Sequence, residues 1–140
     1  MMNVWNTLKS TKLFNCQSNA VHFYEEPELS GLLIEFSVKP CSDLDAPSKK
    51  DPSLSEFLHW LVVNIHGQSI NSGHELASYR GPRPPKGSGP HRYYFLVFKQ
   101  KNQIPRKEVE SRPRFDALAF ARQNGMGDPI AGNFFKAQND

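Results

Sequence analysis

A loop rich in proline and glycine leads directly into a strand at residues 81–95. Its four prolines lack a backbone donor and fix φ, whereas its three glycines permit a positive φ and let a ligand approach the main chain closely. Three basic residues in this segment lie beside an imidazole and two phenols. The pattern indicates an anion-binding loop. A proline-stiffened surface loop before an edge strand is the alternative.

Apolar runs at residues 59–65 and 93–98 have almost no polar break, and they predict strands that are buried on both faces. The run 32–38 predicts a further strand, which we expect to end at Lys39-Pro40 because proline cannot donate to a ladder. Residues 129–135 predict a last strand with a glycine kink. The chain therefore reads as mostly β.

One helix is expected after Ser111 and Pro113. Phe115, Leu118 and Ala119 follow the i, i+3, i+4 spacing of an apolar helix face, and a glycine after the run is typical of a helix C-terminus.

Composition restricts the class of protein. A length of 140 residues fits one domain, and a net charge of +3 is too small for a dedicated nucleic-acid binder, so a small acidic ligand or partner fits better. Cys16 and Cys41 are too few for a disulfide framework, which favours a reducing compartment and a cytoplasmic location. Residues 1–20 contain no apolar run, so we expect neither a signal peptide nor a transmembrane segment.

The residues give little support to catalysis. Asp43, Asp45, His59 and His91 have no close pairing of the kind that metal sites show, so we predict no metal and no cofactor. No Gly-x-Ser-x-Gly is present, although Ser88 is flanked by glycines. A hydrolase is nevertheless one of the functions that we consider. It would require turnover of a simple ester, and His91→Ala would abolish that turnover. Asp43 and Asp45 have an alternative role, in which each side chain caps its own backbone. The alternative role of His59 is a structural one.

Two ordered motifs carry a resemblance to a known family. The first is Asp43-x-Asp45-Ala46-Pro47-Ser48, followed after ten residues by His59. The second runs from Gly81 to Tyr93 and contains Pro84-Pro85-Lys86-Gly87-x-Gly89-x-His91-Arg92-Tyr93. Together they closely resemble the phosphatidylethanolamine-binding protein family, which includes the Raf kinase inhibitor proteins. Later matches at Arg114-Phe115 and residues 129–135 extend the likeness over residues 43–140.

The resemblance implies a central antiparallel sheet, a smaller second sheet and one or two peripheral helices. It implies a binding protein rather than an enzyme, with a pocket for phosphate-type anions such as a phosphatidylethanolamine headgroup or a phosphorylated small molecule. By matching position, the ligand-binding residues would be Asp43, Pro47, His59, Pro84, Pro85, His91 and Tyr93. A protein kinase is an implied partner.

The chain departs from the family pattern at both ends. We expect residues 1–42 to form a divergent, partly disordered segment and residues 43–140 to form the family domain, with a fold that is incomplete at both ends. The alternatives to anion binding are a folding-impaired isoform without ligand function and a member that inhibits serine proteases.

Overall fold

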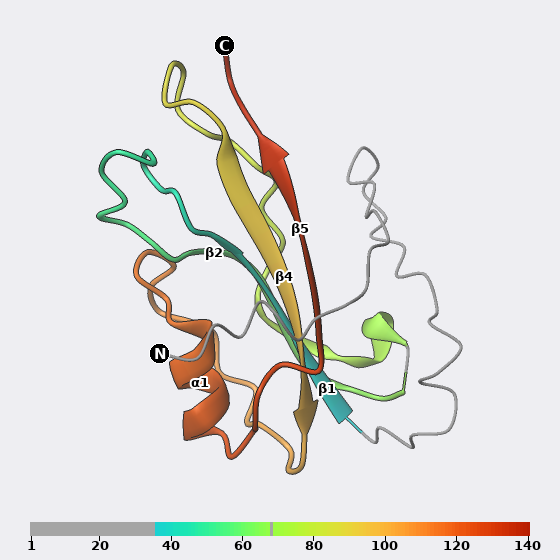
Figure 1. Cartoon of the computed structure of the whole chain (residues 1–140). Coiled ribbons are helices and arrows are strands. Elements are labelled where there is room, and N and C mark those ends of the chain that lie inside the picture. The colour runs from blue at the N-terminus through green and yellow to red at the C-terminus, as the bar shows by residue number, and fades with distance from the viewer. Residues whose placement is uncertain (1–35, 68) are drawn as a thin grey trace.

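The computed structural model describes residues 36–67 and 69–140, which form an antiparallel sheet with a helix beside it (Figure 1). The strands are β1 (Phe36–Asp43), β2 (Phe57–Ile65), β3 (His74–Ala77), β4 (His91–Gln100) and β5 (Ala131–Ala137). Among the described residues, a 3-10 turn, η3 (Ile70–Ser72), precedes β3, and one α-helix, α1 (Ala117–Gln123), follows β4. The strand order is β3-β2-β1-β4-β5, so β1 lies at the centre.

This architecture confirms the predicted mostly-β fold with a central antiparallel sheet and a peripheral helix. Strands β2 and β4 lie where the two apolar runs predicted them, and every residue of β2 after Phe57 is buried. Within the described ranges the strands form one sheet, so the smaller second sheet implied by the resemblance is not seen there. In the same ranges, no helix is both long enough and apolar enough to cross a membrane.

The prediction that Lys39-Pro40 ends a strand is wrong. Strand β1 runs through both residues and pairs with β2 on one side and β4 on the other. The pairing with β4 passes from Val38 directly to Cys41, and the pairing with β2 shifts register between Ser37 and Lys39. These irregularities accommodate a residue that cannot donate to a ladder. Residues 1–35, on which most of the predicted disordered segment falls, lie outside the described residues.

Helix α1 is present but begins later than the sequence suggested. Arg114 has a positive φ of 58°, which is incompatible with a helix, and the side chain of Asp116 caps the helix by accepting from the main chain of Ala119. The residues it buries are Ala117 and Ala121, whereas the predicted core residue Leu118 is exposed.

Each face of the sheet has its own apolar cluster. The cluster that contains the helix residues is centred on Leu58, Leu61 and Phe98. The second cluster contains Trp60 and Phe95, and it continues towards the ends of β1 and β4 where the polar residues of the motifs lie. The sheet therefore provides a rigid apolar support on which a buried polar site can be held.

Candidate functional site

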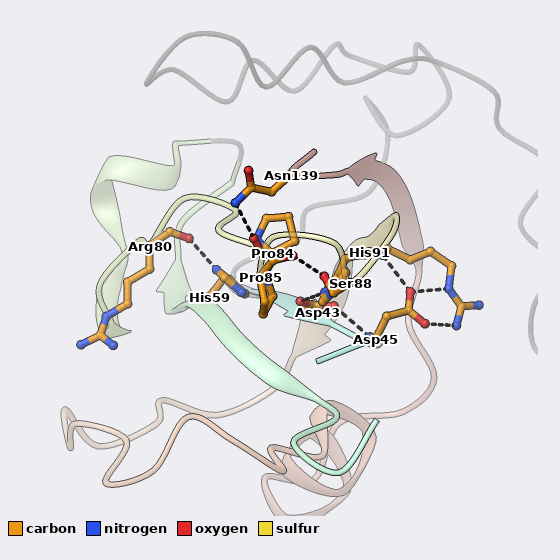
Figure 2. Close-up of polar contacts among 10 residues, drawn as sticks. Asp43, Asp45, His59, Arg80, Pro84, Pro85, Ser88, His91 and Asn139 are labelled. Carbon is orange, nitrogen blue, oxygen red and sulfur yellow. Dashed lines mark hydrogen bonds and ion pairs between the residues drawn. The ribbon is translucent and has the colours of Figure 1, made fainter. Parts of the chain in front are cut away.

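Asp43, the last residue of β1, forms two hydrogen bonds in the interior of the protein. Its Oδ2 lies 2.8 Å from Nδ1 of His91, and its Oδ1 accepts from the main chain of Asp45 at 2.8 Å (Figure 2). Because β1 and β4 are antiparallel, the end of β1 lies opposite the start of β4, where His91 is fully buried. Strand pairing thus brings together two motif residues that are 48 positions apart.

The other nitrogen of His91 faces the glycine-proline loop. Its Nε2 lies 2.8 Å from the hydroxyl of Ser88, which also donates to the carbonyl of Pro85 at 2.6 Å. The flanking Gly87 and Gly89 have φ values of 73° and 80°, which a residue with a side chain adopts only with strain. The glycines therefore permit the turn that returns Ser88 to the imidazole.

The ring of Tyr93 packs near both imidazoles of the motifs. Its ring centroid is 5.1 Å from that of His59 and 6.5 Å from that of His91, and it stacks on Phe135 at 5.0 Å. The side chain is 1% exposed, and its hydroxyl forms no hydrogen bond with any described residue. Burial, followed by the negative charge and the acceptor oxygens of nearby Asp43, raises the pKa of Tyr93, so the phenol stays protonated and can donate.

His59 is fixed by main-chain contacts. Its Nδ1 lies 2.7 Å from the carbonyl oxygen of Arg80, and because a carbonyl only accepts, Nδ1 carries the proton. The main chain of Arg80 donates in return to the carbonyl of His59 at 2.8 Å. Burial lowers the pKa of His59, so the neutral imidazole is favoured and its Nε2 is left as an acceptor.

The second carboxylate of the first motif, Asp45, has a structural partner. It accepts from the main chain, Nε and Nη2 of Arg92, at 2.9, 2.8 and 2.7 Å. These hydrogen bonds hold the pKa of Asp45 below its usual value. The pair joins the turn after β1 to β4, so Asp45 supports the site instead of facing a ligand.

The prolines have different positions. Pro84 is buried, and its carbonyl accepts from Nδ2 of Asn139 at 3.2 Å, while the carbonyl of Asn139 accepts from the main chain of Gly87 at 3.1 Å (Figure 2). Pro85 is exposed in the same loop. Pro47 is half-buried after a cis peptide bond, and none of the contacts above involves it.

The structure thus brings four of the seven predicted residues into one cluster, Asp43, His59, His91 and Tyr93, and Ser88 joins them through His91. We call these five residues the His-Tyr cluster. Sequence reasoning noted Ser88 between its two glycines only in connection with a hydrolase and did not include it among the ligand-binding residues. Nothing in the sequence pointed to Asn139, whose contact with Pro84 spans 55 positions.

Comparisons with known proteins agree with the motifs. The phosphatidylethanolamine-binding protein profile matches residues 38–135. The Drosophila melanogaster protein named "Putative odorant-binding protein A5" is 38% identical over 103 residues, which is 69% of this chain and 49% of that protein. The chain therefore spans about half the length of this relative.

Two solved structures resemble the sheet and its loops. The structure of carboxypeptidase Y inhibitor, complexed with the cognate proteinase, has a TM-score of 0.67 and 31% identity, and the match covers 75% of this chain and 60% of the inhibitor. The solution structure of CG7054 has a TM-score of 0.63 and 42% identity, covering 76% and 64% of the two chains. Because the profile match extends over well more than half of the sequence, this chain belongs to the phosphatidylethanolamine-binding protein family.

Proposed function

We propose that this protein binds phosphate-type anions at the His-Tyr cluster, and that its role is binding and not turnover. The observation that carries the proposal is the hydroxyl of Tyr93, which is buried without a hydrogen-bond partner among the described residues. A buried donor without a partner costs about 1–3 kcal/mol. A ligand oxygen that accepts from this phenol would offset the cost, which makes the hydroxyl a reasonable element of a binding site.

The groups around Tyr93 suit a small zwitterionic headgroup. A phosphate oxygen would accept from the phenol, and Nε2 of neutral His59 would accept from a protonated phosphate or an ammonium group. Asp43 accepts two hydrogen bonds already, but a carboxylate has about four acceptor positions and would also attract an ammonium. Phosphatidylethanolamine carries both charges, and so does free phosphorylethanolamine.

Calorimetric titration of the whole chain with phosphorylethanolamine, inorganic phosphate and ethanolamine tests the proposal. We expect phosphorylethanolamine to bind most tightly, phosphate more weakly and ethanolamine most weakly. Vesicles with and without phosphatidylethanolamine then distinguish a lipid headgroup from the free compound. Equal or undetectable heats for all three compounds would refute anion binding at this site.

Inhibition of a serine protease is a second candidate function. It is supported by the 31% identity to carboxypeptidase Y inhibitor, which was solved in complex with its proteinase. Incubation of a serine carboxypeptidase with increasing amounts of this protein should reduce peptide hydrolysis in proportion to the amount added. Full protease activity at excess protein would exclude this function without affecting the anion proposal.

A protein kinase partner and a cytoplasmic location also remain part of the proposal. The first is supported only by family membership. The second agrees with Cys41, which is buried and forms no disulfide within the described part of the chain. A folding-impaired form is the opposing proposal, and a cooperative unfolding transition in urea would exclude it.

A further inference from the structure

Three side chains of the His-Tyr cluster form a continuous hydrogen-bonded chain. The hydroxyl of Ser88 lies 2.8 Å from Nε2 of His91, and Nδ1 of the same ring lies 2.8 Å from Oδ2 of Asp43 (Figure 2). The order of atoms, from hydroxyl to Nε2 and from Nδ1 to carboxylate, is the one that activates a serine nucleophile. We propose that Ser88 is an acyl acceptor, activated by His91 and Asp43, that reacts stoichiometrically with small activated carboxylic esters.

The hydrogen-bond partners fix which nitrogen can act as a base. An ionised Asp43 only accepts, so Nδ1 of His91 carries the proton and, in the neutral ring, the lone pair of Nε2 points at Ser88. The hydroxyl of Ser88 has one proton, which the carbonyl of Pro85 also attracts at 2.6 Å. That carbonyl also accepts from the main chain of Ser88 at 3.1 Å, so it keeps a donor when the hydroxyl turns to the imidazole.

The loop leaves room for a substrate beside Ser88. Ser88 is partly exposed, and a Cβ added at either Gly87 or Gly89 would meet nothing within 4 Å. The main-chain N–H of Gly89 forms no hydrogen bond with any residue that the structure describes. The N–H that follows a serine nucleophile is a usual donor to the oxyanion of the tetrahedral intermediate.

The covalent step balances without any further reactant. Oγ of Ser88 attacks the carbonyl carbon of the ester, and its proton passes to Nε2 of His91. The new Oγ–C bond remains when the ester C–O bond breaks, and His91 returns the proton to the departing alkoxide or phenoxide. The products are acyl-Ser88 and one molecule of alcohol or phenol. The triad lies within the His-Tyr cluster, but its reaction does not depend on anion binding, and its test requires no anion.

The experiment exposes the whole chain to 4-nitrophenyl acetate and follows acetylation by intact mass and peptide mapping. Ser72 is an internal control, because its hydroxyl donates to the carbonyl of Ser69 at the same distance of 2.6 Å and accepts from the main chain of His66 at 2.9 Å. Ser72 is also more exposed than Ser88. A positioned general base contributes about 10²-fold or more, so we expect acetylation of Ser88 to be about a hundredfold faster than that of Ser72.

Variants identify the cause of the difference. Ser88→Ala should remove the fast acetylation, His91→Gln should reduce it to the rate of Ser72, and Ser72→Ala should leave it unchanged. Acetylation of Ser88 at or below the rate of Ser72 would overturn the proposal, and so would an unchanged rate in folded His91→Gln. If His91→Gln fails to fold, the comparison of the two serines in the unaltered chain still decides the question.

Discussion

Oδ2 of Asp43 lies 2.8 Å from Nδ1 of His91, and both side chains are almost completely removed from solvent. Asp43→Asn keeps the shape of the side chain but removes its charge. We expect the free energy of unfolding to fall by about 1.5–3 kcal/mol, the usual contribution of a hydrogen bond to a charged group. Urea denaturation measures the change. Asp51→Asn, at an exposed position, is the matched control, and an equal effect of the two variants would contradict a special role for Asp43.

Tyr93→Phe should separate stability from binding. The change removes a buried hydroxyl that has no partner among the described residues, so the ligand-free protein should become more stable by about 1 kcal/mol. The same change removes the donor proposed for the ligand, so the affinity for phosphorylethanolamine should fall about tenfold or more. Urea denaturation and calorimetry provide the two values. A variant that loses stability and keeps its affinity would show that the hydroxyl has a structural role.

Arg92→Gln should destabilise the turn that follows β1. The carboxylate of Asp45, which is 1% exposed, accepts three hydrogen bonds from Arg92. The substitution removes the two side-chain donors and keeps only the main-chain donor. We expect a loss of roughly 2 kcal/mol in the free energy of unfolding. Lys107→Gln is the control, because the ion pair of Lys107 with Glu110 is highly exposed and should contribute little. Equal losses in both variants would contradict the argument.

The lowered pKa of Asp45 should make the stability of the protein depend on pH in the acid range. Arg92 holds the pKa of folded Asp45 below its usual value of 3.8, so the unfolded chain binds the proton more readily. The stability from this carboxylate is complete above pH of about 4 and is lost as the pH falls through the lower folded pKa. Asp45→Asn should therefore flatten the decline of stability below pH 4. A decline as steep as that of the unaltered chain would assign it to other groups.

The lowered pKa of His59 should make stability depend on pH in a second, higher range. Burial lowers the pKa of folded His59 below its usual value of 6.5, so the neutral ring is stabilised in the folded protein. Its contribution is complete above about pH 6.5 and is lost as the pH falls through the lower folded pKa. Thermal unfolding between pH 5 and 7 should have a smaller pH slope in His59→Gln. His66→Gln, at an exposed histidine, should keep the full slope.

The sequence predicted the parts of the fold that depend on local patterns. The apolar runs identified β2 and β4 as two inner strands of the sheet. The predicted burial on both faces is confirmed for β2 and is wrong for β4, where half-buried residues alternate with buried ones. The inclusion of Lys39-Pro40 within strand β1 could not be predicted from a local pattern. Whether a proline ends a strand or is accommodated at an irregularity depends on the neighbouring strands, and these pair with β1 from distant parts of the chain.

The site was predicted in its residue types more than in its contacts. The motifs selected both imidazoles and Tyr93, but the sequence did not reveal that His91 is engaged at both nitrogens, by Asp43 and Ser88. Because both nitrogens of His91 are engaged, the proposed donor to the ligand is the phenol of Tyr93. The distinction between Asp43 and Asp45 also required the structure, because only strand pairing decides which carboxylate meets Arg92.

The most direct measurement of the central claim is a titration of the whole chain with phosphorylethanolamine, followed by NMR at the five histidines. We predict saturable changes in the ring signals of His59 and His91, because both rings contact Tyr93. The signals of exposed His66 and His74 should not move, and Tyr93→Phe should weaken the response. Unchanged signals of His59 and His91 at saturating ligand, or equal shifts of all the histidines, would contradict anion binding at the His-Tyr cluster.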